Sequence, residues 1–133
     1  MPDKSLRILI ADAQHFNRLR IERLFNQLGY FRVAPVHSLD ELLPLVEYAG
    51  EPLDLVLVNG TMARGGLDLF SFLADNPQVH HGYIFNEQQA PVRSVAGKVQ
   101  VSQAALPDLA SITQLMSTVD RRLPFVGTVI SVR

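Results

Sequence analysis

Short apolar runs rich in β-branched residues alternate along this chain with segments of helical periodicity. The clearest runs span residues 6–11 and 53–58, and weaker ones span residues 31–36, 83–85 and 98–101. Each run is too short for a helix and is typical of a buried strand. The pattern therefore predicts five strands.

The segments between these runs repeat apolar residues at three- and four-residue steps, as amphipathic helices do. This spacing predicts helices over residues 16–28, from Ser38 through Ala49, over residues 67–74, and from near Pro107 to Leu123. The first of them has an apolar face that includes Phe16, and Gly29 follows it as a stop signal.

Two of the helical segments carry special features. Ser38-Leu39-Asp40-Glu41 has the pattern of a capping box, in which the Ser hydroxyl and the Glu carboxylate each bind a free amide of the first turn. Pro44 lies inside this helix and is expected to kink it or to cost about 3 kcal/mol. Residues 87–97 contain Pro91 and are expected to form a short or irregular helix.

Strands that alternate with helices predict right-handed βαβ units and a parallel sheet covered on both faces. The predicted fold class is α/β, a doubly wound domain with about five parallel strands. Its ligand site would lie beyond the carboxyl ends of the strands. No composition shift marks a boundary, so residues 1–123 are predicted to form one domain, and residues 124–133 a β-prone tail that belongs to it or begins a linker.

The tail has no charged residue between Pro124 and Val132 and is rich in β-branched side chains. Such a segment would be a sticky edge if it were left exposed. We expect it to pack on its own domain, as an extra β segment, or to pair with a second copy. The third interpretation is that it opens a further domain of a longer protein.

Composition excludes several classes of function. The 133 residues are 47% hydrophobic, and the formal net charge of −1 leaves no excess to attract nucleic acid or anionic lipid. Cys is absent, which excludes disulfides, thiolate metal sites and Cys nucleophiles. The chain begins without a signal-peptide pattern and has no apolar stretch near the roughly 18 residues that span a bilayer. A cytoplasmic protein without nucleic-acid or membrane partners is expected.

The candidate site residues are the polar residues that follow the predicted strands. They are Asp12, Asn59, Asn86, and Gln103 with its neighbour Ser102. Asp12 is the one acid expected at the mouth of the crevice, because Glu87 is expected to begin a helix and to point away. No nucleophile–base pair or acid pair follows the strands, so an enzyme is not predicted.

The order and spacing of these segments resemble the CheY-like receiver domains of two-component response regulators. The resemblance covers about residues 6–123 and implies a CheY- or flavodoxin-like sandwich with a role in bacterial phosphorelay signalling. It rests on the run Ile8–Asp12, the Arg-rich helix closed by Leu28-Gly29-Tyr30, the run Asp54–Asn59, and Met62 with Gly66–Leu69 after it.

The resemblance also shows where this chain departs from the family. In receivers two acids after the first strand hold Mg²⁺, and an Asp ending the third strand accepts a phosphoryl group that a hydroxyl residue and a Lys then contact. By position, Asp12 matches the first acid and Ala13 replaces the second. Asn59 replaces the phosphoacceptor, Asn86 stands at the hydroxyl position, and Gln103, or alternatively Ser102, stands at the Lys position.

These replacements change the chemistry of the crevice. An amide is a far poorer nucleophile than a carboxylate, so Asn59 would not form an acyl phosphate. Mg²⁺ takes oxygen ligands, usually carboxylates together with substrate phosphate, and Asp12 alone supplies too little charge to hold it firmly. We therefore predict a pseudo-receiver with no catalytic residue, no bound metal and no cofactor.

Such a domain would act by protein–protein contact, through the face made by the last two predicted helices and the tail. The resemblance implies signalling partners: a histidine kinase, another regulator or an output domain. A homodimer is a further expectation.

A second function also fits the sequence. Doubly wound domains bind many kinds of ligand at the same crevice. The hydrogen-bonding groups of Asp12, Asn59, Thr61, Asn86 and Gln103 would suit a neutral polar ligand or a nucleotide. A thermal-shift screen with nucleotides would separate a small-molecule sensor from an interaction domain.

The dipeptide Asn59-Gly60 suggests two further hypotheses. It is a common hairpin turn, but the residues after it have no β pattern, so a hairpin is not expected. Deamidation at this dipeptide would convert Asn59 to Asp or isoaspartate and partly restore the phosphoacceptor. Genuine loss of the acceptor is the favoured interpretation.

Other polar clusters are interpreted as surface features. His80-His81 lacks an acid or Cys at metal-ligand spacing and is expected on a surface loop. Arg18, Arg20 and Arg23 form a basic stripe that is expected to be a solvated helix face, with a docking surface for an acidic partner as the alternative.

Overall fold

The strands and helices alternate along the chain in the computed structural model, which describes residues 2–63, 67–87 and 97–120. The strands are β1 (Ile8–Ala11), β2 (Val33–Val36), β3 (Leu55–Asn59), β4 (Gly82–Phe85) and β5 (Val99–Val101). The helices are α1 (His15–Gln27), α2 (Leu39–Glu47), the 3-10 turn η1 (Gly60–Met62), α3 (Leu69–Asp75) and α4 (Leu109–Val119).

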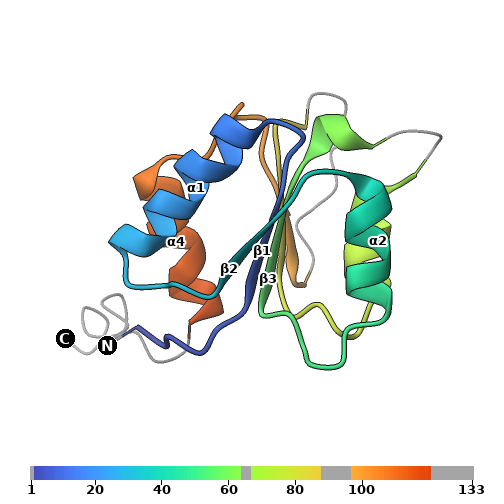
Figure 1. Cartoon of the computed structure of the whole chain (residues 1–133), viewed down its shortest axis with the longest axis horizontal. Helices are drawn as coiled ribbons and strands as arrows, with labels where there is room; N and C mark the ends of the chain where they lie inside the picture. Colours follow the sequence, from blue (N-terminus) through green and yellow to red (C-terminus); the bar gives the residue numbers. More distant parts are fainter. Residues whose placement is uncertain (1, 64–66, 88–96, 121–133) are drawn as a thin grey trace.

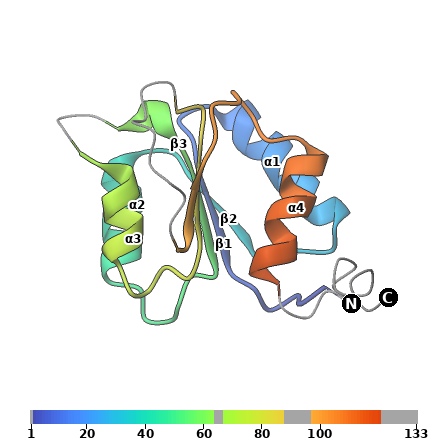
Figure 2. The same cartoon turned by 180° about the vertical axis from the view of Figure 1, so that it is seen from behind.

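The strands form one parallel sheet in the order β2-β1-β3-β4-β5. Helices α1 and α4 cover one face of this sheet, and α2 and α3 cover the other (Figures 1 and 2). The doubly wound α/β fold and the five predicted strands are therefore confirmed.

Both faces of the central strands are buried, as their continuous apolar runs predict. Successive side chains of a strand point to opposite faces. Ile8 and Ile10 of β1 pack into the layer of α1 and α4, and Leu9 and Ala11 pack into the layer of α2 and α3.

Side chains fix the starts of the helices. Ser38 Oγ accepts a hydrogen bond from the Glu41 amide (3.2 Å), as the capping box predicts. The Glu41 carboxylate reaches one residue further back and accepts from the His37 amide (3.1 Å). Pro44 lies within α2, which continues to Glu47, so the proline leaves one main-chain donor missing without ending the helix.

α4 begins two residues after Pro107, close to the predicted start, and is capped by Asp108, whose carboxylate accepts from the Ser111 amide (2.8 Å). One detail of the helix predictions was wrong. Phe16 is 63% exposed and does not belong to the buried face of α1. It precedes the buried Ile21 by five residues, which places it roughly 140° around the helix.

Strand β2 is an edge of the sheet and contains Pro35. The carbonyls of Arg32 and Val36 accept hydrogen bonds from the main-chain amides of Ile8 and Asp12 (2.9 and 3.0 Å), so even-numbered positions of β2 face the sheet and the Pro35 nitrogen faces outward. Pro35 therefore has no N–H to donate at the outer edge of the sheet, and this hinders the addition of another strand there.

Three sequence predictions concern residues outside the described ranges: the irregular helix within residues 87–97, Leu123 at the end of the last helix, and the tail of residues 124–133. Within the described ranges, no helix has the length and apolar character needed to cross a bilayer.

Candidate functional site

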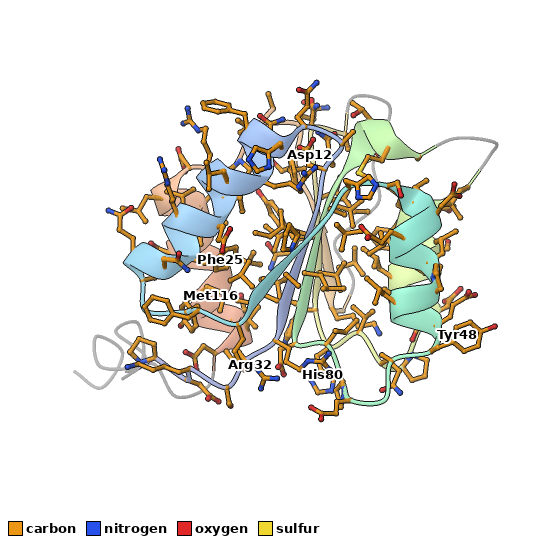
Figure 3. The ribbon with its side chains drawn as sticks, in the orientation of Figure 1. Asp12, Phe25, Arg32, Tyr48, His80 and Met116 are labelled. Carbon is orange, nitrogen blue, oxygen red and sulfur yellow. The ribbon has the colours of Figure 1, made fainter. Side chains whose placement is uncertain are left out.

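The site lies at the carboxyl ends of β1 and β3, which are adjacent in the sheet. Asn59 is the last residue of β3, and Asp12 directly follows β1. The register pairs Ala11 with Val58, so the residues after them lie side by side. Figure 3 shows Asp12 at the end of the sheet from which α1 begins.

Asp12 is only 1% exposed, and its carboxylate accepts three hydrogen bonds from neutral donors. Oδ1 accepts from the Gln14 amide (2.8 Å), and Oδ2 accepts from Asn17 Nδ2 (3.1 Å) and Asn59 Nδ2 (2.9 Å). These bonds offset the desolvation of a buried carboxylate, which is otherwise severe. The carboxylate is held by amide groups.

Asn59 joins Asp12 to the loop after β3. Its Nδ2 donates to Asp12, and its Oδ1 accepts from the amide and the hydroxyl of Thr61 (2.9 and 2.7 Å) and from Asn86 Nδ2 (3.3 Å). A carboxylate only accepts hydrogen bonds, so the amide nitrogen must face Asp12 and the amide oxygen must face Thr61. An Asn side chain fits this position because it offers a donor and an acceptor at once.

Asn86 has a positive φ of 55°, in the left-handed region. Asn adopts this conformation more readily than most residues. The main-chain N–H of Asn86 donates to the Ala104 carbonyl (2.8 Å), and the main-chain N–H of Glu87 donates to the Ser102 carbonyl (3.1 Å). The turn after β4 is thereby tied to the loop after β5.

The remaining predicted positions lie at the rim. Ala13 and Gln103 are both exposed, and Ser102 is half-buried. The Ser102 hydroxyl accepts from the Ala104 amide (3.1 Å) and so belongs to the loop after β5. The structure therefore brings Asp12, Asn59 and Asn86 into one network.

The expectation that Glu87 points away from the crevice was wrong. Its Oε2 lies 2.6 Å from the point where a Cβ on Gly60 would stand, and its Cα lies 3.1 Å from that point. Glu87 thus packs against the residue that follows Asn59, because the left-handed turn at Asn86 redirects the chain. Even so, no three His, Cys, Asp or Glu side chains in the described ranges are grouped so that they could hold a metal ion.

Sequence reasoning missed two contributors from α1. Asn17 donates to Asp12, and Arg18 Nη1 donates to the Asp12 carbonyl oxygen (2.6 Å). Arg18 was assigned only to the basic stripe. Both residues lie in the first turns of the helix that begins three residues after Asp12. This short spacing could have indicated that their side chains lie close to Asp12.

The His pair lies elsewhere. His80 is exposed, with its Nδ1 3.4 Å from Asp54 Oδ1, at the end of the sheet opposite Asp12 (Figure 3). This agrees with a surface loop, although the acidic partner was not foreseen. His15 is exposed at the start of α1.

The chain after Asn59 forms η1 and not a hairpin, as expected. Asn59 is 5% exposed, and both of its amide atoms are hydrogen-bonded. Deamidation would have to break these bonds before the Gly60 nitrogen could attack the side chain.

Comparison with known proteins gives a relationship at the level of fold. No protein-family model matches the sequence, and no curated protein matches it. Among solved structures, the chain is similar to the N-terminal domain of a response regulator/sensory box/GGDEF 3-domain protein from Carboxydothermus hydrogenoformans. The TM-score is 0.62 at 14% sequence identity, and the match covers 96% of this chain and 99% of the other.

This similarity defines the class of fold: the chain has a receiver-like α/β fold. At 14% sequence identity this similarity shows the fold alone.

Proposed function

We propose that this chain is a pseudo-receiver, a receiver-like domain that takes part in signalling by contact with other proteins and is not phosphorylated by the usual Asp chemistry. The proposed domain comprises residues 1–123 with the tail of residues 124–133, and the proposed setting is the cytoplasm. The proposed partners are signalling proteins: a histidine kinase, another regulator or an output domain.

One contact carries this proposal: the hydrogen bond from Asn59 Nδ2 to Asp12 Oδ2 (2.9 Å). In a receiver these two positions would hold carboxylates with a metal ion between them. Here an amide occupies the phosphoacceptor position and donates directly to the remaining carboxylate. Such a pair offers neither an attacking oxyanion nor an opening for a cation between the two side chains.

The same network argues against a small-molecule sensor as the main function. A ligand would need the polar atoms of Asp12 and Asn59, yet both side chains are buried and already bonded to each other and to their neighbours. Binding there would first break bonds that are strong because they are buried or charge-assisted.

Phosphorylation with a small phosphodonor and Mg²⁺ tests the proposal. The wild type should give no acid-stable, base-labile phosphoprotein by mass spectrometry. The Asn59→Asp variant should recover little labelling, because Ala13 still leaves the metal short of a ligand. Asn59→Asp combined with Ala13→Asp is the matched positive control, since it supplies both an acceptor and an acid pair.

Two results would contradict the proposal. Labelling of the wild type would show a phosphoacceptor that the geometry does not provide. A large, saturable rise in melting temperature with a nucleotide would favour the sensor function instead.

A further inference from the structure

Helix α4 differs from the other α-helices in the described part of the chain because it carries no charged side chain. Residues 109–119 contain no Asp, Glu, Lys or Arg, whereas α1, α2 and α3 each contain at least one. Thr113, Gln114 and Ser117 nevertheless lie exposed on its outer side. Water-facing helix surfaces usually carry charges, and depletion of charge is typical of surfaces covered by other protein.

The hydroxyl groups of this surface are bonded within the helix. Thr113 Oγ1 donates to the Leu109 carbonyl (2.7 Å), and Ser117 Oγ donates to the Gln114 carbonyl (2.6 Å). Thr118 Oγ1 donates to the Leu115 carbonyl of the same helix (2.8 Å). These hydroxyls already have an acceptor, so an apolar segment could cover them without stranding a hydroxyl donor, whereas the Gln114 carboxamide would have to stay at the rim in contact with water. We call this outer side of α4, with Thr113, Gln114 and Ser117, the uncharged face.

The end of α4 is held in place at Asp120. This residue is buried, and its carboxylate accepts from the Tyr30 hydroxyl (2.5 Å) and from the Asp3 amide (2.9 Å). Desolvation by burial and the hydrogen bond to Asp120 raise the pKa of Tyr30, which keeps the phenol a donor. Figure 2 shows α4 beside α1, in the layer that these two helices form on one face of the sheet. Residues 121–133 thus continue from a fixed point at the end of the uncharged face.

We propose that residues 123–132 of the same chain dock on the uncharged face of α4. These ten residues carry no charge and are mostly apolar, so docking would desolvate no charged group on either the segment or the face. The eleven residues of α4 span about 16 Å. Ten extended residues span about 33 Å, so the segment is long enough to turn and run back along the whole helix. This inference does not depend on the pseudo-receiver proposal.

The segment's own chain is the favoured source because the tether keeps it close. A short flexible linker gives an effective concentration in the millimolar range. At low micromolar protein, a second copy competes poorly with a segment attached at Asp120.

Cysteine pairs test this inference directly, since the chain contains no Cys of its own. The test variant carries Ser117→Cys and Thr128→Cys. The matched control carries Gln27→Cys and Thr128→Cys. Ser117 and Gln27 are both exposed. Ser117 lies three residues before Asp120, and Gln27 lies three residues before Tyr30, which contacts Asp120 (2.5 Å), so both positions are near the start of the segment.

The measured quantity is the rate of intramolecular disulfide formation in full-length protein at low micromolar concentration. We expect the Ser117 pair to close at least about tenfold faster than the Gln27 pair, which corresponds to a docking preference of about 1.4 kcal/mol. Equal rates would overturn the proposal. Disulfide-linked dimers whose yield rises with protein concentration would overturn it as well, because the segment would then come from a second copy.

Discussion

Replacement of Asn59 by Asp would place a second carboxylate against Asp12. In the wild type the two side chains meet through Asn59 Nδ2 and Asp12 Oδ2, at 2.9 Å. Two charged oxygens at this separation would repel each other by about 6 kcal/mol at an effective dielectric constant of 20. The pair would therefore share a proton in the folded variant.

The sign of the pH dependence follows from that proton. The folded variant keeps a proton that the unfolded chain releases above about pH 4. Its stability is therefore fully present at low pH and is lost as the pH rises. We expect Asn59→Asp to lower the free energy of unfolding by about 3–5 kcal/mol at pH 7.5, and about 3 kcal/mol of this loss to return at pH 5.

Urea unfolding followed by circular dichroism at both pH values measures this effect. The control is the exchanged pair, Asp12→Asn with Asn59→Asp, which restores one amide and one carboxylate in contact. It should recover more than half of the lost stability. Wild-type stability for Asn59→Asp at pH 7.5, or a loss that does not change with pH, would refute the contact between residues 12 and 59.

Two further predictions concern the loops around the sheet. Gly60→Ala should destabilise the protein by about 1–3 kcal/mol in urea unfolding, because its Cβ would stand 3.1 Å from Glu87 Cα, a main-chain atom that cannot swing aside as the Glu87 carboxylate can. Gly50→Ala, with no atom within 4 Å, should be neutral or slightly stabilising; equal effects would show that Glu87 does not pack against Gly60. Hydrogen bonds from Ser111 lower the pKa of Asp108 below its ordinary value of 3.8, so its negative charge stabilises the start of α4 at higher pH. In a pH series of denaturation curves, the stability difference between wild type and Asp108→Asn should therefore vanish as the pH falls below 3.8. A difference that persisted to about pH 2 would contradict this.

The sheet was predictable because its strands are short apolar runs that no other regular structure explains. The strand ends were equally predictable: Asp12 follows β1, Asn59 ends the adjacent strand β3, and the structure places them in contact. Helix starts followed from local chemistry at Ser38.

The rest of the site depends on geometry that no local pattern encodes. The position of Glu87 follows from the left-handed φ of Asn86, and no sequence pattern indicates which Asn adopts that conformation. Phe16 fits the three- and four-residue spacing of an apolar face, but the buried side of α1 is the one that carries Ile21 and Phe25, and Phe16 does not lie on it. The bond from Arg18 to the Asp12 carbonyl depends on how α1 sits above the sheet.

A Mg²⁺ titration that follows the side-chain amide resonances of Asn17 and Asn59 by NMR tests the central claim most directly. Both amides donate to the Asp12 carboxylate, so a cation bound there must displace or perturb them. The account predicts that neither resonance moves at millimolar Mg²⁺ in the wild type. A saturable shift of both resonances would show that the crevice holds a divalent cation and would contradict the pseudo-receiver assignment.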